Sequence, residues 1–555
     1  MITRAAAISA LQAETFDVVV VGGGITGAGV ALDAATRGYS VALVEKADFA
    51  SGTSSRSSKL VHGGLRYLQN FDLGLVREAL LERQLMVRLA PHLVTPLALV
   101  VAAFDGARPD RLVGVGLNLY DVMAVDRTRG RRRRGGVDEH TDWSPDRHRV
   151  IAGAEVAELL PALAARKPTS GYLFYDCQTD DARLVLTVLG EAERFGAVCA
   201  NRLHVTDLVE RAGRTCGVYV RDGLSGERFE INAANVINAT GVWADRLRPD
   251  ELHDEAEVPR IRPSRGTHIT LAHERLPLVA GAIVPAGAGR TIFALPWLGS
   301  TLVGTTDNDY DSDALDHIRP ASEDLDYLLD ALNAYFHAGL TRADITGAFA
   351  GVRPLISTGD PKKSVDISRK AELYETSSGM ITITGGKLTT WRRMAKLAVD
   401  RLVEREARDA PCRTHEIPLG QRVDPADLPR VEGVAEAAYA GLAARYGHVA
   451  HDVLALAAQR GELAQPIVTT GPSDLLAEAV FAAQREQAGS VGDALLRRSR
   501  VGLLAARAVT ADGDDVARRV ATAMAPELGW DQPRIEAEVD AFATEAAAEA
   551  ICVDP

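Results

Sequence analysis

The chain has 555 residues, of which 46% are hydrophobic and 25% are charged, so it can bury large cores and is not disordered. At about 150 residues per domain, this length predicts three or four folded units. Lys and Arg total 62 against 75 Asp and Glu, and the net charge of −13 argues against nonspecific nucleic-acid binding as the main function.

The five cysteines, Cys177, Cys199, Cys216, Cys412 and Cys552, are scattered without a C-x-x-C pair or clustered histidines. This pattern predicts neither a disulfide framework nor a metal site, and it fits a reducing cytoplasm.

Membrane insertion is not predicted either. The longest apolar runs, 93–104 and 276–289, are shorter than the roughly 20 residues that span a bilayer. The first fifteen residues lack the apolar stretch of a secretory signal.

A dinucleotide-binding pattern opens the chain. The apolar run 17–21 leads into Gly22-x-Gly24-x-x-Gly27 and a small-residue stretch, which predicts a buried parallel strand, a tight turn and a helix. The glycines allow close approach to a pyrophosphate, which the helix N-terminus attracts. A second strand, 39–44, ends at Glu45, whose carboxylate suits ribose hydroxyls. The pattern alone fits NAD as well as FAD.

Residues 51–59 follow this unit and are rich in hydroxyl groups. Thr53, Ser54, Ser55 and Ser57 suit further pyrophosphate and flavin contacts, with a solvated serine-rich loop as the alternative. A later strand, 235–238, runs into Ala239-Thr240-Gly241, a strand end common in flavoproteins with two dinucleotide domains.

Further elements follow in chain order. Residues 73–89 predict an amphipathic helix, and six arginines within 127–134 predict an exposed loop, either solvated or docked on anionic lipid. Residues 216–220 and 228–231 predict a hairpin, 267–305 an antiparallel sheet, and 323–338 a helix. The strand 380–384 precedes a glycine turn and a helix through Trp391. Beyond 413, helical periodicity predicts a separate helical domain.

Residues 59–68, KLVHGGLRYL, closely resemble the FAD-dependent glycerol-3-phosphate dehydrogenases. Segments 119–121, 175–184, 302–307, 351–355 and 385–390 resemble that family's signatures, in the same order. The likeness covers about residues 16–402, and 485–500 resembles the family's C-terminal helical domain.

The resemblance, together with these elements, implies an α/β fold. A Rossmann-like FAD-binding domain (16–90, 185–260 and 345–412) is interleaved with an antiparallel-sheet substrate domain (91–184 and 261–344). A C-terminal α-helical domain (413–555) follows.

The resemblance also implies a function: oxidation of sn-glycerol 3-phosphate to dihydroxyacetone phosphate by hydride transfer to FAD, with electrons passed to a membrane quinone. It implies peripheral contact with the inner face of the cell membrane, and a homodimer stays open. One alternative is a glycerol-3-phosphate oxidase that uses oxygen, although the insertion common in such oxidases is absent here. The other is a catalytically idle flavin-binding regulatory subunit, which His62, Arg66, Arg353 and Lys387 together argue against.

Several residues carry over from the family's motifs. Removing a hydride from an alcohol requires a base for the hydroxyl proton, and His62, with an ordinary pKa of about 6.5, is the candidate; a structural histidine beside the flavin is the alternative. Lys387 and the helix start beside it suit the negative charge of reduced flavin. For the substrate and its phosphate, the predicted ligands are Arg66, Tyr67, Arg353, Arg369, Thr305 and Thr306.

The predicted cofactor ligands combine the glycine turn, the hydroxyl-rich loop and the two later strand ends. They are Gly22, Gly24, Gly27, Glu45, Thr53, Ser54, Ser55, Ser57, Lys59, Leu60, His62, Gly63, Ala239, Thr240, Gly241, Gly385, Gly386, Lys387, Leu388 and Thr389.

Overall fold

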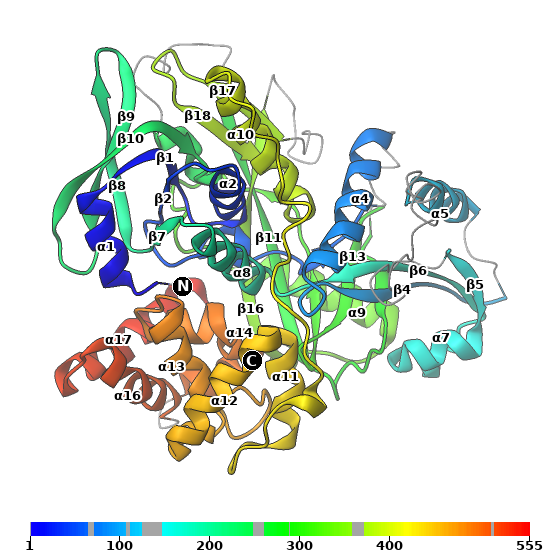
Figure 1. The fold of residues 1–555 in the computed structure, drawn as a ribbon. Helices are drawn as coiled ribbons and strands as arrows, with labels where there is room; N and C mark the ends of the chain where they lie inside the picture. The colour runs from blue at the N-terminus through cyan, green and yellow to red at the C-terminus, as the bar shows by residue number, and fades with distance from the viewer. Residues whose placement is uncertain are drawn as a thin grey trace.

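The computed structural model describes residues 2–64, 72–106, 111–124, 147–247, 260–287, 289–357, 371–511 and 515–554. Two β-sheets lie side by side, and a set of helices formed by the C-terminal part of the chain packs beneath them in the view of Figure 1. This arrangement confirms the predicted α/β class with a helical C-terminal part.

The first sheet is the nucleotide sheet, and five of its strands are parallel. Its main path is β17 (Ala371–Glu375), β18 (Ile381–Gly385), β10 (Arg228–Asn238), β1 (Thr15–Val21), β2 (Val41–Val44) and β7 (Val198–Ala200). Strands β9 (Arg214–Asp222) and β8 (Leu203–Arg211) extend antiparallel from β10. The predicted hairpin is therefore present, but segments 228–231 and 235–238 form one continuous strand, β10.

Strand β1 is buried on both faces, which explains its unbroken valine run. Val18 and Val20 pack with the helices α2 (Ile25–Thr36), α8 (Asp181–Arg194) and α10 (Trp391–Arg405). Val19 and Val21 pack on the opposite face, which α1 (Arg4–Ala13) and the β8–β9 extension cover. The sheet thus lies between two layers, and its carboxyl edge is left for a ligand.

The second sheet is larger and mostly antiparallel. Its main path is β15 (Asn308–Asp309), β11 (Arg260–Ala272), β14 (Ser300–Gly304), β13 (Thr291–Trp297), β12 (Gly281–Pro285), β4 (Thr95–Ala103), β6 (Ser170–Gln178) and β3 (Leu60–Val61). Strand β16 (Ile345–Ser357) pairs with β11, and β5 (Arg149–Ala152) pairs with β6. The pair β12–β4 is parallel, so the sheet is mixed rather than purely antiparallel.

Helices border this second sheet. They are α4 (Leu73–Leu89), α5 (Arg111–Ala124), α7 (Gly153–Leu159) and α9 (Ser322–Phe336). The apolar side of α9, including Leu325, Leu328 and Leu332, packs into the core of the sheet. The predicted boundaries between domains stay predictions, and β16, which begins at the predicted boundary of 345, hydrogen-bonds to β11 in this sheet.

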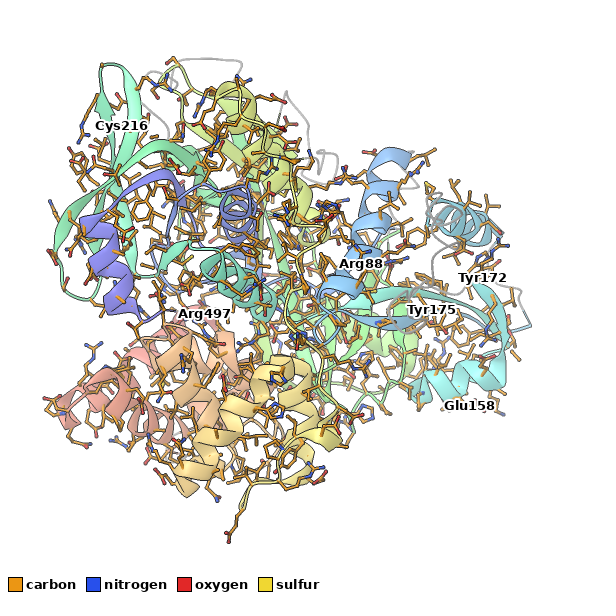
Figure 2. The ribbon with its side chains drawn as sticks, viewed as in Figure 1. Arg88, Glu158, Tyr172, Tyr175, Cys216 and Arg497 are labelled. Carbon is orange, nitrogen blue, oxygen red and sulfur yellow. The ribbon has the colours of Figure 1, made fainter. Side chains whose placement is uncertain are left out.

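The C-terminal part is helical, as predicted. It contains α11 (Glu436–Tyr446), α12 (Ala450–Gln459), α13 (Leu476–Arg485), α14 (Val501–Leu504), α15 (Ala506–Thr510), α16 (Val516–Leu528) and α17 (Gln532–Glu549). Buried arginines join it to the nucleotide sheet: Arg497 and Arg498 donate to Asp48 at 2.7 and 2.8 Å. Figure 2 shows Arg497 where the two parts meet. Such buried ion pairs fix the orientation of the C-terminal part only while the arginines and the aspartate are both present, because a buried charge without its partner is costly.

Candidate active site

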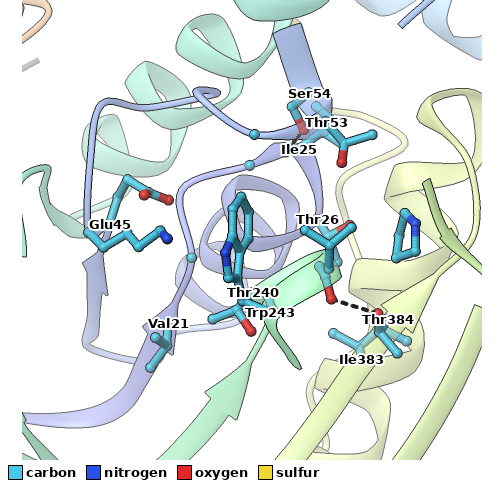
Figure 3. Close-up of a pocket in the computed structure, with 18 of the residues that line it drawn as sticks. Val21, Ile25, Thr26, Glu45, Thr53, Ser54, Thr240, Trp243, Ile383 and Thr384 are labelled. Atoms are coloured by element: carbon cyan, nitrogen blue, oxygen red, sulfur yellow. Dashed lines mark hydrogen bonds between the residues drawn. The ribbon is translucent and has the colours of Figure 1, made fainter. Parts of the chain in front are cut away.

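A cleft opens at the carboxyl ends of β1, β2, β10 and β18. Figure 3 shows Glu45 on one side of this cleft and Ile383 and Thr384 on the other. The carboxyl edge of a parallel sheet is where α/β proteins bind nucleotides, because the strand order reverses there and the connecting segments separate.

The glycine turn forms the floor of the cleft. Gly22 has a φ of +113°, and a Cβ there would lie 2.7 Å from the carbonyl oxygen of Ala239. A Cβ on Gly27 would lie 1.9 Å from the oxygen of Gly22, so Gly27 supports the turn from below while Gly22 and Gly24 line the cleft. Gly24 is the N-cap of α2 and has no side chain; Ser54 accepts from the N–H of Ile25, and the helix start at Ile25 and Thr26 lines the cleft, where its positive end favours an anion.

Glu45 follows β2 and lines the cleft. Its Oε2 accepts from the N–H of Gly23 at 2.7 Å, and Oε1 accepts from that of Ala47 at 2.9 Å. Burial raises the pKa of Glu45 above its ordinary value, although the two N–H groups oppose this by stabilising the carboxylate. The carboxylate is held in place where a ribose would need an acceptor.

The hydroxyl-rich loop divides into two parts. Thr53 and Ser54 line the cleft, and the Oγ of Ser54 accepts from the N–H of Ile25 at 2.9 Å, which joins the loop to the start of α2. The other predicted ligands in the loop point elsewhere: the Oγ of Ser57 donates to Asp181 at 2.7 Å, and the Nζ of Lys59 donates to Asp181 and to the carbonyl of Ser55.

The opposite wall comes from β10 and β18. Ala239, Thr240 and Gly241 line it together with Gly385, Gly386, Lys387 and Leu388. The Oγ1 of Thr384 donates to the carbonyl of Gly241 at 3.2 Å and closes the wall, as the dashed line in Figure 3 marks. A Cβ on Gly386, whose φ is +70°, would lie 2.2 Å from the sulfur of Met394, so this turn requires glycine.

His62 follows β3 and lies against this wall. Its N–H donates to the Oγ1 of Thr389 at 3.1 Å, and that hydroxyl donates back to the carbonyl of His62 at 3.2 Å. Leu60 is buried in β3, and the N–H of Gly63 donates to the phenol of Tyr120 at 2.8 Å. The motif 60–63 and the turn 385–389, which are more than 300 residues apart in the chain, are thus brought together.

Arg353 lies on β16, beside Pro354, which lines the cleft. Its Nη1 donates to Asp307 at 2.8 Å and its Nη2 to the Oγ1 of Thr305 at 3.3 Å. Thr306 has a structural partner, because its Oγ1 accepts from the N–H of Thr267 at 2.9 Å. The remaining predicted substrate ligands, Arg66, Tyr67 and Arg369, lie outside the described residues, as does the arginine block 127–134.

Two residues of the site were missed by sequence reasoning. Trp243 lines the cleft, and the ammonium of Lys46 lies 4.2 Å from the centre of its ring. Asp307 holds the Arg353 fork. Trp243 follows Ala239-Thr240-Gly241 by two residues, and Asp307 is the last residue of the family-like segment 302–307, so these two segments carry the signals that could have indicated them.

The cleft fits a flavin dinucleotide. Two glycine turns, at Gly22 and Gly386, bring backbone without side chains to the cleft, and the Glu45 carboxylate and the α2 start supply the acceptor and donors that a ribose and a pyrophosphate need. The wall formed by Gly241 to Trp243 and by Gly385 to Leu388 continues the cleft away from Glu45, beyond the part that a single nucleotide would occupy.

Residues 17–401 match the FAD dependent oxidoreductase family, and 380–535 match the C-terminal domain of alpha-glycerophosphate oxidase. Glycerol-3-phosphate dehydrogenase 2 of Mycobacterium tuberculosis is 38% identical over 557 residues, covering 99% of this chain and 91% of that protein. The chain belongs to the FAD-dependent glycerol-3-phosphate dehydrogenase family.

Other members of the FAD-dependent glycerol-3-phosphate dehydrogenase family are similar along most of the chain. The aerobic glycerol-3-phosphate dehydrogenase of Bacillus subtilis is 36% identical and covers 88% of this chain and 87% of that protein. The glycerol-3-phosphate dehydrogenase of Bacillus halodurans, solved with FAD, is 29% identical, with a TM-score of 0.77 over 100% of this chain and 98% of that one.

The family's cofactor is FAD, and the described residues show no sign of a metal centre or a membrane span. No group of three or more His, Cys, Asp or Glu among them could hold a metal ion. None of the described helices is long and apolar enough to cross a membrane.

Proposed function

We propose that the chain oxidises sn-glycerol 3-phosphate to dihydroxyacetone phosphate with FAD, and that the electrons then pass to a membrane quinone. The observation that supports this proposal is that the backbone of His62 is hydrogen-bonded to Thr389, the residue after Leu388 in the cleft wall, and that Arg353 directly precedes Pro354, which lines the cleft. This neighbourhood supports a base and an anion-binding fork close to one flavin cleft.

The reaction removes a hydride from the secondary carbon and a proton from its hydroxyl group. Bound FAD supplies the acceptor for the hydride. His62 accepts the hydroxyl proton on a ring nitrogen, which a neutral imidazole can do near pH 7. The mutual hydrogen bonds between the His62 backbone and Thr389 fix the backbone from which the imidazole extends.

The substrate phosphate requires a cationic partner. Arg353 offers a planar fork, and Asp307 and Thr305 hold two of its nitrogens, so its orientation is set before the substrate binds. Arg66, Tyr67 and Arg369, taken from sequence alone, complete the proposed phosphate site. Lys387, which lines the cleft, offsets negative charge on the reduced cofactor.

Peripheral membrane contact is the second part of the proposal, and helix α5 supports it. Val115, Leu119 and Val122, at helical spacing on one side of α5, are 66%, 38% and 68% exposed. The buried Leu117 and Tyr120 occupy the other side, so α5 has more apolar surface than its own packing uses. In the sequence, six arginines within 127–134 follow this helix, a charge that suits anionic lipid headgroups.

An anaerobic flavin-reduction experiment tests the reaction. The purified yellow protein, mixed with glycerol 3-phosphate, is expected to lose its oxidised-flavin absorbance, and a water-soluble quinone analogue is expected to restore it. No bleaching would contradict the reaction. Rapid recovery with oxygen but not with quinone would assign the chain to the oxidases instead.

Arg353→Lys tests the anion site within the same assay. A point charge cannot replace the fork, so KM is expected to rise at least about tenfold while FAD affinity is unchanged. Arg275→Lys is the matched control, because Arg275 also pairs with an aspartate, Asp344, but at the far end of β16. If Arg353→Lys weakened FAD binding as much as it weakened the use of substrate, Arg353 would be a structural residue and not a substrate ligand.

The membrane contact is tested by co-sedimentation with anionic liposomes. Val122→Asp is expected to reduce binding, because it places a charge on the apolar side of α5. Val279→Asp is the control, since Val279 is similarly exposed, at 64%, but lies outside α5. Equal binding by both variants would contradict docking through α5.

A further inference from the structure

A buried cluster of four charged side chains lies where the C-terminal helices meet the hydroxyl-rich loop 51–59. It consists of Lys59, Asp180, Asp181 and Arg500, and we name it the four-charge cluster. Each member is at most 9% exposed. Arg497, labelled in Figure 2, lies at the same junction between the C-terminal helices and the rest of the chain.

Asp181 is the centre of the cluster. Its carboxylate accepts from the Nζ of Lys59 at 2.8 Å, from the Oγ of Ser57 at 2.7 Å and from the N–H of Ser57 at 3.0 Å. Arg500 donates to the same carboxylate. One aspartate at the start of α8 therefore binds the loop at two residues and the C-terminal part at a third.

Arg500 reaches into the cluster from the other side. Its Nη2 donates to Asp180 at 2.8 Å, and its Nη1 donates to the carbonyl of Leu496 at 3.0 Å. A longer contact, at 3.4 Å, joins Nη1 to the carbonyl of Ser55 in the loop. The guanidinium thus connects a backbone atom of the C-terminal part, both aspartates and the loop.

The loop held in this way contributes directly to the cleft. Its first half, 51–54, lines the cleft, and Ser54 accepts from the first turn of α2. Its second half ends at Lys59, whose carbonyl accepts from Thr179 at 2.9 Å, and β3 and His62 follow at once. A shift of the loop would therefore move both the cofactor contacts and the proposed base.

The charges of the cluster balance, two positive against two negative, and its ammonium lies against two aromatic rings. The Nζ of Lys59 lies 4.8 Å from the centre of the Phe349 ring and 5.4 Å from that of Trp297. In such surroundings, removing one charged partner leaves the others uncompensated, which is far more costly than losing an exposed pair. Loss of Arg500 would leave two carboxylates facing one ammonium.

We propose that Arg500 is a positioning residue for the flavin loop: through Asp180 and Asp181, the C-terminal helices set the path of residues 51–59 and so the affinity for FAD. The four-charge cluster unites three segments that resemble family signatures, at 59–68, 175–184 and 485–500, without any of its side chains lining the cleft. This inference rests on FAD binding alone, and it does not depend on the proposed substrate or electron acceptor.

The test compares Arg500→Met with Arg183→Met. Arg183 is a matched control because it is also buried, also crosses the boundary to pair with Glu486, and stacks on Tyr446 in the C-terminal part rather than on the loop. Apoprotein is titrated with FAD well below each variant's unfolding temperature, and hydrogen exchange of residues 51–59 is followed in the apoprotein. Neither readout requires turnover.

Arg500→Met is expected to weaken FAD binding at least about tenfold and to speed exchange in the loop, whereas Arg183→Met lowers thermal stability and leaves both readouts near wild type. Arg500→Lys keeps the charge but loses the planar fork, so its FAD affinity is expected to lie between those of wild type and Arg500→Met. Arg500→Lys takes the place of Arg500→Met in the test if Arg500→Met does not fold. Wild-type FAD affinity in either Arg500 variant, or an equal loss in Arg183→Met, would overturn the proposal.

Discussion

Gly27→Ala tests whether the glycine turn positions the start of α2 for the FAD pyrophosphate. A Cβ at this position would lie 1.9 Å from the oxygen of Gly22 and 3.0 Å from its carbonyl carbon. Both are backbone atoms, so no side-chain rotation can relieve the overlap, and α2 must move by about 1 Å or more relative to the turn.

The expected cost has two parts. Overpacking of a tight contact costs about 1–3 kcal/mol in unfolding free energy. A displacement of this size also breaks the alignment of the helix N–H groups with a phosphate, and the loss of one charge-assisted hydrogen bond, about 1.5–3 kcal/mol, weakens FAD binding roughly 10- to 100-fold.

Urea unfolding measures the overpacking cost. Titration of the apoprotein with FAD, followed by flavin fluorescence, measures the loss of FAD affinity. Gly190→Ala is the control: Gly190 lies inside α8, where a Cβ would meet nothing within 4 Å. That substitution is expected to stabilise the protein by about 1 kcal/mol without changing FAD affinity. FAD affinity in Gly27→Ala equal to wild type would refute the reasoning.

Three further predictions concern other parts of the molecule. Asp307→Asn loosens the Arg353 fork, which Asp307 holds at 2.8 Å, and is expected to raise KM for glycerol 3-phosphate about tenfold with unchanged FAD affinity in steady-state and titration assays. Trp391→Ala empties a site that is 1% exposed and is expected to lower the unfolding free energy by about 3–5 kcal/mol in urea. Burial lowers the pKa of His92 to about 4 from about 6.5, so the native state binds fewer protons than the unfolded chain between these values. His92 is therefore expected to lower the stability of the wild type relative to His92→Gln as the pH falls from 6.5 to 4, by up to about 1.4 kcal/mol per pH unit, which urea unfolding of both proteins across this range measures.

Local patterns predicted a helix beside the second sheet and the elements at the floor of the cofactor cleft. The helix expected at 73–89 is α4 (Leu73–Leu89), and the strand, turn and helix of the dinucleotide unit are β1 and α2 with their glycines between them. These succeed because hydrophobic periodicity and turn chemistry depend on neighbours a few residues away.

What could not be predicted depends on partners far along the chain. Lys59 stands in a serine-rich segment that is typical of a solvated loop, yet it is fully buried, because Asp181, 122 residues later, receives its ammonium. The tie between His62 and Thr389 likewise joins residues 327 positions apart. The pattern of residues within either segment does not indicate which distant residue it contacts. Only the family resemblance predicts that His62 lies near the flavin.

The cleft has walls from strands that are made at very different times during synthesis. Its first wall is complete at Glu45, but the wall formed by β18 requires residue 385 of 555. At about 5–20 residues per second, a ribosome needs roughly 20–80 s to reach that point. The nascent chain therefore holds one wall of the cleft while the 340 residues after Glu45, up to Gly385, are made, and FAD can contribute the full stabilisation of binding only once β18 has been added.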